Sequence, residues 1–347
     1  MRKIIGYFGL LVLINCVMVS TSMAAKLVLI SVPSNSEPFS LDGKDDAFWQ
    51  DAKPVNVTVN ELPYEPNNGY KGAKSSDVSI KSVYDDEYVY FIFKWTDDSL
   101  DLNRFPWQKQ KDGSWKQLKN KDDTHHENTY YEDKIAVYWD INQRGFIKKG
   151  CDKSCHMVEA GKIDGIMDDS SGRHYTSAGE ILDEWQWKAT RINVVNQFDD
   201  GYVNDEKNSN KKWGRHSDSG AGGYYNNINE NKDAPMYQNK IESEKEKYFV
   251  QDKNKILLED NHQLNDIVGG IITRVSTGSR ADVDAKAFWD GESWTLEARR
   301  KLVTQDKTYD LQFDDLSEKY YFGVATFDNS QINHLYHKKS IQFTFEQ

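Results

Sequence analysis

The amino-acid sequence predicts an all-β fold, an antiparallel β-sandwich with one long, irregular insertion. Aromatic residues make up 13% of the chain, and strands favour aromatic and β-branched residues. Several short segments alternate apolar and polar residues with a period of two and are separated by polar turns, which is typical of a β-sandwich. No apolar pattern with the period of a helix is long enough to indicate an α/β fold.

The first half of the chain contains the clearest predicted strands. Val89, Phe91, Phe93 and Trp95 share one face of the second strand of a hairpin, because alternate residues of a strand point to the same side. Residues 85–87 form the polar turn of this hairpin. The elements expected here are a short strand at 26–31, a turn at 41–49 that leads into a buried Phe-Trp pair, a half-buried strand at 55–59, the hairpin at 78–95 and a strand at 134–140.

A long stretch without periodicity separates this half from the next. Residues 142–263 are rich in Asp, Asn, Lys and Gly. A structureless loop of this length is uncommon in a compact domain unless it is functional, and a bound prosthetic group could supply the missing order. We therefore expect one β-sandwich domain over residues 26–347 with an insertion at 142–263. The strands expected after the insertion lie at 281–285, 294–300, 320–327 and 341–345.

The N-terminus predicts a secretory signal peptide. Arg2 and Lys3 precede an apolar run at 4–19, and the small residues at 22–25 suit cleavage. We expect residues 1–25 to be removed and the mature chain to be secreted across the inner membrane, into the periplasm or an equivalent non-cytoplasmic compartment. The alternative is an uncleaved membrane anchor, for which the apolar run is short.

The charge balance narrows the possible partners. The chain has 44 Lys and Arg against 55 Asp and Glu, which gives a net charge of −11. An acidic surface repels the phosphate backbone, so the composition argues against nucleic-acid binding. It argues equally against adsorption to a membrane surface through a basic patch.

Cys151, Cys155 and His156 form the motif with the most specific chemical meaning. Two cysteines followed directly by a histidine are the arrangement that attaches haem covalently, the thiols adding to the vinyl groups and the histidine reaching the iron. The usual motif has two residues between the cysteines, whereas this one has three. The alternative is a local disulfide, which a secreted protein with one pair of cysteines would readily form.

Further iron ligands are available. Met157 follows the motif directly, and a thioether is a soft ligand that raises the reduction potential of haem iron. The alternative for a single methionine is that it fills the core, and Met167 and Met236 offer the same chemistry. The histidines at 125–126 and 334–337 are more simply explained as solvated side chains.

Other catalytic patterns are missing from the sequence. The acidic pairs 168–169 and Asp199-Asp200 are expected to be solvated turns rather than catalytic carboxylates. We find no Ser/His/Asp arrangement, no phosphate-binding loop and no set of ligands with zinc spacing.

The sequence resembles the haem-binding gamma subunits related to ethylbenzene dehydrogenase, which accompany periplasmic molybdenum enzymes of the dimethyl sulfoxide reductase class. The resemblance covers most of the mature chain, and the order of the matching segments is its specific feature. These segments lie at 41–43, 48–49, 132–137, 150–156, 183–189, 198–202, 215–218, 222–227, 294–304, 322–329 and 334–338.

The resemblance implies a β-sandwich that holds one haem b between a methionine and a lysine. The lysine corresponds to Lys338, with Lys339 as second choice, and the methionine to Met157, with Met236 as second choice. A lysine binds iron only as the neutral amine, so burial and the metal must lower its pKa.

Two features depart from the short members of that family. The Cys-Cys-His motif and the insertion at 142–263 both suggest a second, covalently attached haem c. This combination is most similar to the gamma subunit of a nitrite oxidoreductase.

The function implied is that of a non-catalytic electron-transfer subunit. Electrons would leave a molybdenum-containing catalytic subunit, pass through an iron–sulfur subunit to haem b, and continue to haem c or a soluble cytochrome. The two cysteines of the mature chain are too few for a four-thiolate cluster, and no pterin site is visible. The alternatives are a secreted carbohydrate-binding β-sandwich, which residues 41–49 also resemble, and a free multihaem carrier that serves no molybdenum enzyme.

Overall fold

The computed structural model describes most of the chain. The predicted signal peptide, residues 1–25, lies outside the described residues. Among those that are described, no helix is both long and apolar enough to span a membrane. The described residues are 26–35, 37–153, 175–206, 214–240, 246–259 and 261–347, with the backbones of β8 (Lys162–Ile163) and β9 (Ile166–Met167).

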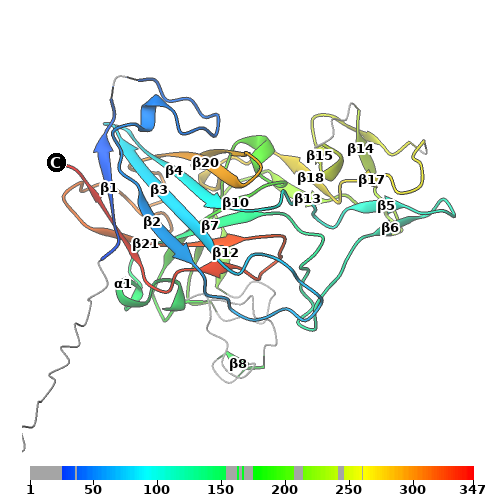
Figure 1. Cartoon of the computed structure of the whole chain (residues 1–347), viewed down its shortest axis with the longest axis horizontal. Coiled ribbons are helices and arrows are strands. Elements are labelled where there is room, and N and C mark those ends of the chain that lie inside the picture. Colours follow the sequence, from blue (N-terminus) through cyan, green and yellow to red (C-terminus); the bar gives the residue numbers. More distant parts are fainter. Residues whose placement is uncertain are drawn as a thin grey trace, which may run out of the picture.

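One large sheet dominates the described part of the chain (Figure 1). Its strands run in the order β12-β11-β10-β7-β21-β23-β1-β3-β4-β20-β19, with β2 on β3 and β22 on β21. The neighbours are antiparallel except for β1, which is parallel to both β23 and β3. The strands are β1 (Val28–Pro33), β2 (Val55–Val59), β3 (Ser76–Tyr84), β4 (Tyr88–Thr96), β7 (Lys134–Asp140), β10 (Leu182–Lys188), β11 (Asp199–Val203), β12 (Arg215–Ser217), β19 (Val283–Trp289), β20 (Ser293–Lys301), β21 (Tyr320–Phe327), β22 (Leu335–Tyr336) and β23 (Ile341–Phe345).

The sheet curls until its two halves face each other across an aromatic core. The Phe91 ring of β4 lies 5.5 Å from the Trp139 ring of β7, measured between centroids, and the rings of Trp95 and Trp187 are 5.8 Å apart. The ends of the sheet also meet, since the Phe198 N–H donates to the Val283 carbonyl at 2.9 Å. The predicted all-β sandwich is therefore confirmed.

The predicted Phe-Trp anchor packs on the opposite face of β3 and β4, in a separate cluster with Val83, Tyr90 and Ile92. Phe48 and Trp49 are buried in the 3₁₀-helix η1 (Ala47–Trp49). The Trp49 indole donates to Glu297 Oε1 at 2.9 Å, and the Gly43 N–H donates to Glu297 Oε2 at 2.7 Å. Glu297 is buried on β20, so its carboxylate holds the N-terminal turn against this strand.

The stretch 142–263 is not wholly irregular. It contributes β10 and β11 to the main sheet, and every position of β10 is buried. A strand covered on both faces needs no polar alternation, which explains why the periodicity was not visible in the sequence.

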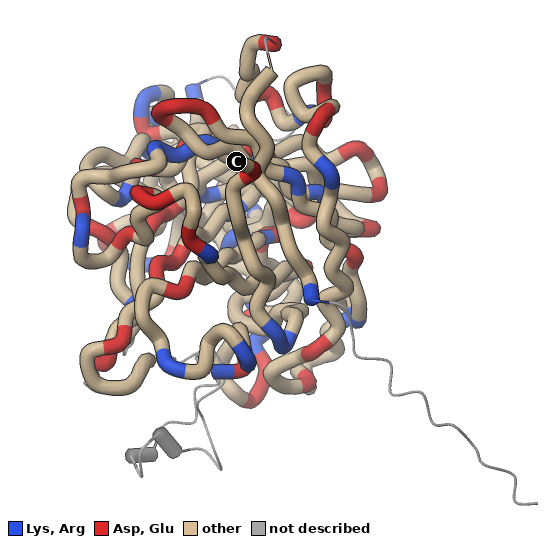
Figure 2. The backbone as a smooth tube through the Cα atoms, turned by 90° about the vertical axis from the view of Figure 1, so that its left-hand side faces the viewer, with Lys and Arg blue, Asp and Glu red and all other residues tan. Residues whose placement is uncertain are grey.

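Smaller sheets extend from one end of the main sheet (Figure 1). Part of the stretch 142–263 contributes to them, together with the hairpin that follows β4. Acidic and basic residues are interspersed along the chain in the view of Figure 2. The smaller strands are β5 (Trp107–Lys109), β6 (Trp115–Gln117), β13 (Gly223–Asn226), β14 (Tyr237–Asn239), β15 (Val250–Gln251), β16 (Lys255–Leu257), β17 (Ile267–Val268) and β18 (Ile271–Arg274).

Candidate functional site

Cys151 lies on the outer face of the main sheet. It belongs to the 3₁₀-helix η2 (Gly150–Lys153), which continues the one-turn helix α1 (Phe146–Lys149). The Cys151 side chain is buried against Gly323 of β21, where a β-carbon would come within 2.6 Å of the sulfur. Glycine at position 323 therefore leaves the space that the thiol occupies.

The Cys151 segment also packs on the segment that carries Lys338. Gly150 has a φ of +50°, and a β-carbon there would lie 2.6 Å from the Lys339 carbonyl carbon. Two hydrogen bonds reinforce this contact, from Ser340 Oγ to the Ile147 carbonyl at 2.7 Å and from the Tyr336 hydroxyl to Asp152 at 2.8 Å. The segment of the cysteine motif and the segment of the expected lysine ligand thus lie together on one face.

Lys338 itself is at the surface. Its side chain is 53% exposed, and its Nζ lies 2.9 Å from Glu61 Oε2. The hydrogen bond to Glu61 raises the pKa of Lys338 above its ordinary value. To bind iron, the amine would have to leave Glu61 and lose its proton, so ligation by Lys338 stays a prediction.

Lys134 is a buried lysine that the sequence reasoning missed. It starts β7 on the face opposite Ile135, and its Nζ donates to the Gln331 carbonyl at 2.7 Å and lies 3.9 Å from the centroid of the Phe327 ring. Burial is the main reason why the pKa of Lys134 is well below its usual value. The alternation of β7 indicates which side of the sheet Lys134 faces. It does not reveal that Lys134 is buried, because Phe327 and Gln331, which contact its side chain, lie almost 200 positions later in the chain.

The remaining predicted ligands are Cys155, His156, Met157 and the second-choice Met236. Cys155, His156 and Met157 lie outside the described residues. Met236 immediately precedes β14, which Figure 1 places at the opposite end of the molecule from α1. Met236 and Lys338 are therefore not placed to share one iron.

Two buried ion pairs lie on the outer face of the main sheet, the face on which Cys151 also lies. Glu132 accepts hydrogen bonds from the backbone N–H groups of Thr190 at 2.7 Å and Arg191 at 2.9 Å, and it pairs with the Arg191 guanidinium. Burial opposes ionisation of Glu132, but Arg191 and the backbone donors outweigh it and hold the pKa of Glu132 below its usual value. Lys188 and Asp199 form a second buried pair.

The prediction of a solvated turn at Asp199-Asp200 is wrong. Both residues are buried on β11. Asp199 pairs with Lys188 and with Arg280, whose NH2 lies 2.6 Å from it. Adjacent acidic residues are typical of a turn in the sequence, whereas here Asp199 pairs with the neighbouring strand β10 and with Arg280 of the 3₁₀-helix η5 (Ser279–Ala281).

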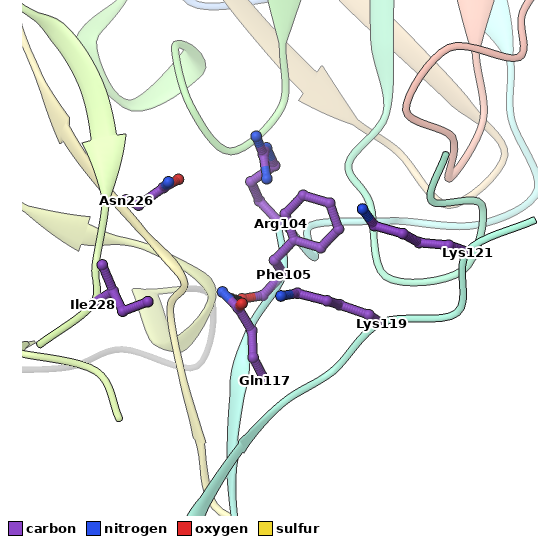
Figure 3. Close-up of a pocket in the computed structure, with 7 residues that line it drawn as sticks. All are labelled: Arg104, Phe105, Gln117, Lys119, Lys121, Asn226 and Ile228. Atoms are coloured by element: carbon purple, nitrogen blue, oxygen red, sulfur yellow. Dashed lines mark hydrogen bonds between the residues drawn. The ribbon is translucent and has the colours of Figure 1, made fainter. Parts of the chain in front are cut away.

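A small basic cleft lies beside the β5–β6 hairpin (Figure 3). It has a volume of about 200 Å³, below the ~300–1,000 Å³ of typical ligand pockets. The Arg104 guanidinium stacks over Phe105, 4.4 Å from the ring centroid, and its Nε has no hydrogen-bond partner among the described residues. Burial lowers the pKa of Arg104. The cleft suits only a small anionic group; its lining is Arg104, Phe105, Gln117, Lys119, Lys121, Asn226 and Ile228.

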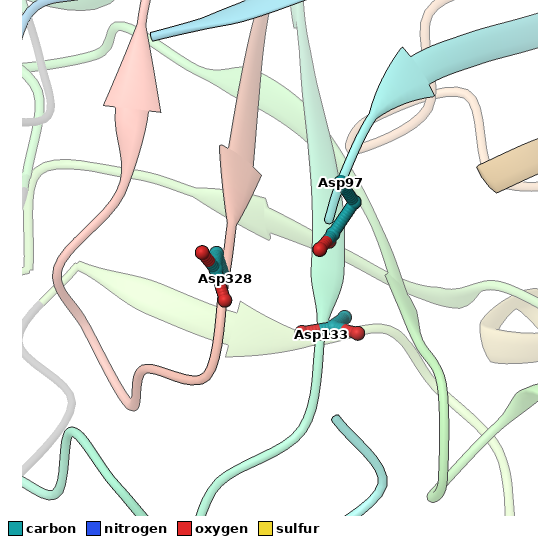
Figure 4. A group of neighbouring side chains, drawn as sticks. All are labelled: Asp97, Asp133 and Asp328. Carbon is teal, nitrogen blue, oxygen red and sulfur yellow. The ribbon is translucent and has the colours of Figure 1, made fainter. Parts of the chain in front are cut away.

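Three carboxylates meet where β4 and β21 end and β7 begins (Figure 4). Asp97, Asp133 and Asp328 have oxygens within 4.8 Å of one another. Each accepts a hydrogen bond, for example Asp133 from the Trp294 indole at 3.2 Å and Asp328 from the Ala73 N–H at 2.7 Å. These bonds make the cluster part of the framework of the sheet edge.

This cluster predicts a pH-dependent stability. Burial, followed by the charge of Asp328, raises the pKa of Asp97 from 3.8 to about 8. Between these values the unfolded chain releases a proton that the folded chain keeps, so folding becomes less favourable as the pH rises through this window.

In the presence of a chelator, Asp328→Asn should reduce this loss of stability by on the order of 1 kcal/mol, measured as urea midpoints between pH 5 and 8. The exposed Asp86→Asn is the control, and equal pH slopes for Asp328→Asn and the unmodified chain would contradict the argument.

Comparisons with known proteins identify the family. The family model described as ethylbenzene dehydrogenase matches residues 46–339, and a comparison with curated protein sequences found no match. A carbohydrate binding module of family 9 from Caldicellulosiruptor kristjanssonii, in complex with glucose, is 9% identical with a TM-score of 0.33 over 91% of this chain and 94% of that chain. A protein from Bacteroides uniformis, carbohydrate-binding by its name, is 8% identical with a TM-score of 0.34 over 93% and 100%. These scores are low, so the fold assignment rests on the strands themselves. The family match takes in most of the sequence, and the chain belongs to the ethylbenzene dehydrogenase family.

Proposed function

We propose that this chain is a non-catalytic electron-transfer subunit that carries haem b and a covalently attached haem c. Membership of a family whose members are subunits of larger oxidoreductase complexes supports the general role. The observation that carries the haem assignment is the contact between the Cys151 segment and residues 338–340. It gathers the two segments that were predicted to bind haem onto one face of β21.

The chemistry of this face fits a porphyrin. The outer side of β7 and β21 carries the small residues Ala136, Gly323 and Ala325, with the aromatic rings of Tyr138 and Phe327 in the same apolar cluster. An apolar cluster suits contact with the edge of an apolar macrocycle, since burying apolar surface is favourable. When bound, haem supplies a one-electron carrier.

The residues have distinct parts in this proposal. Cys151 and Cys155 form the thioether bonds of haem c, and His156 binds its iron. Lys338 and Met157 are proposed as the ligands of haem b. The buried position of Cys151 against Gly323 would fix one edge of haem c relative to the sheet.

The proposed partners follow from the family. They are a molybdenum-containing catalytic subunit, an iron–sulfur subunit and a soluble cytochrome, assembled in the periplasm or an equivalent compartment. Within the family, a nitrite oxidoreductase is the complex that we propose, because of the cysteine motif and the insertion at 142–263.

A pyridine haemochrome spectrum tests the proposal directly, because it counts haem b and haem c separately. We expect one of each per chain when the protein is purified from its native complex. A preparation without a Soret band that binds sugars would instead support the carbohydrate-binding alternative. Haem without any molybdenum or iron–sulfur subunit in the purified complex would support a free carrier.

Substitution of Lys338 is expected to change the spectrum of haem b. Lys338→Ala should open a coordination site, so the iron becomes partly high-spin and binds carbon monoxide. Lys338→Met should keep a six-coordinate, low-spin iron with a shifted potential, because thioether ligation favours the ferrous state. Visible spectroscopy and a redox titration of the intact complex provide the measurements.

Two lysines serve as comparisons in the same experiment. Lys339→Ala is the matched control, since Lys339 is adjacent, exposed and the second choice for the ligand. An unaltered haem b spectrum in Lys338→Ala would rule Lys338 out. A change in Lys134→Met alone would then move the assignment to the buried amine, whose pKa is already low.

A further inference from the structure

We propose that Asp200, Asp218 and Asp310 form a binding site for one calcium ion. Asp200 lies on β11, and Asp218 follows β12, which pairs antiparallel with β11. The Asp218 N–H donates to the Asp200 carbonyl at 3.2 Å, so the two residues are held side by side. Asp310 comes from the loop between β20 and β21. This site is separate from the proposed haem function.

The spacing of the carboxylates suits a calcium ion. One oxygen from each of the three residues lies within 4.8 Å of the others. Calcium–oxygen distances are about 2.3–2.6 Å, so two oxygens on one ion lie at most about 5 Å apart. The residues are only 1% (Asp200), 5% (Asp218) and 2% (Asp310) exposed, so bulk water does not solvate the cluster.

The cluster contains carboxylate oxygens that nothing in the described chain satisfies. Both oxygens of Asp218, Oδ2 of Asp200 and Oδ1 of Asp310 have no hydrogen-bond partner among the described residues. Buried polar groups are nearly always paired, and a buried charge without a partner costs several kcal/mol. Unpaired oxygens on three buried carboxylates whose oxygens approach within 4.8 Å of one another indicate a cation.

The charges around the cluster also require a cation. Asp183 is buried beside the cluster, and Oδ1 of Asp183 is also without a partner. Arg300 lies 3.7 Å from both Asp183 and Asp310. With Asp282, which also lies against Asp310, five carboxylates face one guanidinium. The excess of four negative charges (5 − 1) is reduced to two by a divalent ion.

The ligand type favours calcium over other metals. The cluster offers only carboxylate oxygens, which hard cations prefer, and no thiol or imidazole. Magnesium usually keeps several waters and takes one or two carboxylates, whereas calcium accepts an irregular cage of six to eight oxygens. The carboxylates of Asp97, Asp133 and Asp328 are different, because hydrogen bonds already satisfy them.

Calcium titration of the full chain tests the proposal. The protein is stripped with a chelator and titrated with calcium chloride alone in a calorimeter. We expect the unmodified chain to bind one calcium ion, Asp218→Asn to bind none at this site, and the matched control Asp328→Asn to bind as the unmodified chain does. No heat and no bound calcium in the unmodified chain, or equal binding by Asp218→Asn, would overturn the proposal.

Thermal unfolding separates a calcium ligand from a merely structural residue. With calcium, the unmodified chain should melt at a higher temperature than Asp218→Asn. With chelator the order should reverse, because the substitution removes repulsion between buried carboxylates. A lower melting temperature for Asp218→Asn under both conditions would overturn the proposal. If Asp218→Asn does not fold, Asp310→Asn and the calcium content of the unmodified chain, measured by atomic emission, decide in its place.

Discussion

Replacing Cys151 and Cys155 together with alanine is expected to abolish covalently bound haem. The proposed thioether bonds need both sulfurs, and the third cysteine of the chain, Cys16, lies in the predicted signal peptide. After denaturing gel electrophoresis and haem staining, the band of the unmodified chain should keep its colour and that of the double variant should lose it. The haem b count should not change, because its proposed ligands are Lys338 and Met157.

Gly323→Ala provides a complementary test that leaves both cysteines in place. The added methyl group would lie 2.6 Å from the Cys151 sulfur, so the thiol must move and the yield of attached haem should fall. A colourless band from the unmodified chain, with a disulfide between the cysteines found by mass spectrometry, would establish the disulfide alternative instead.

Replacing Glu132 with alanine is expected to destabilise the fold by about 3–5 kcal/mol, the usual cost of removing one partner of a buried ion pair. Arg191 would be left buried without its carboxylate, and the N–H groups of Thr190 and Arg191 would lose their acceptor. Chemical denaturation of the chain gives the measurement. Glu132→Gln should cost less, because it keeps an acceptor for the backbone donors.

The exposed pair of Lys301 and Glu87 is the matched control. Its Nζ–Oε1 distance is 2.9 Å, but the side chains are 56% and 59% exposed. Exposed ion pairs contribute roughly 0–1 kcal/mol, so Glu87→Ala should leave the free energy of unfolding almost unchanged. Equal losses in Glu132→Ala and Glu87→Ala would mean that the burial of Glu132 has no energetic consequence.

The predictable parts of the fold are those whose burial is one-sided. The strand at 55–59 shows strict alternation in the sequence, and β2 is buried at every second position. β10 was not predicted, because all seven of its positions are buried and its outer face carries Glu184, Gln186 and Lys188. A charged residue buried by a long-range partner has the same local pattern as an exposed one.

The residue types of the candidate site can be read from the sequence, but their arrangement cannot. The cysteine motif is visible because its residue types and their order suggest haem attachment, which stays a prediction. Its contact with residues 338–340 is not visible, since it runs through the backbone beside Gly150. The burial of Lys134 and of Asp200 was missed for a related reason: their cover comes from residues far away in the chain.

The parallel strand β1 has a consequence for the order of folding. It lies between β3 and the last strand, with Val28 paired to Gln342 and Ser31 to Ser82. The sheet therefore cannot close until the final residues have been synthesised, and pairings this distant in sequence form slowly. Until then, the backbone at 338–340 that Gly150 packs on is not in place, and Cys151 remains accessible. Haem would accordingly be attached before the chain has finished folding. Closure of the sheet would then bury Cys151 with the haem already bound to it.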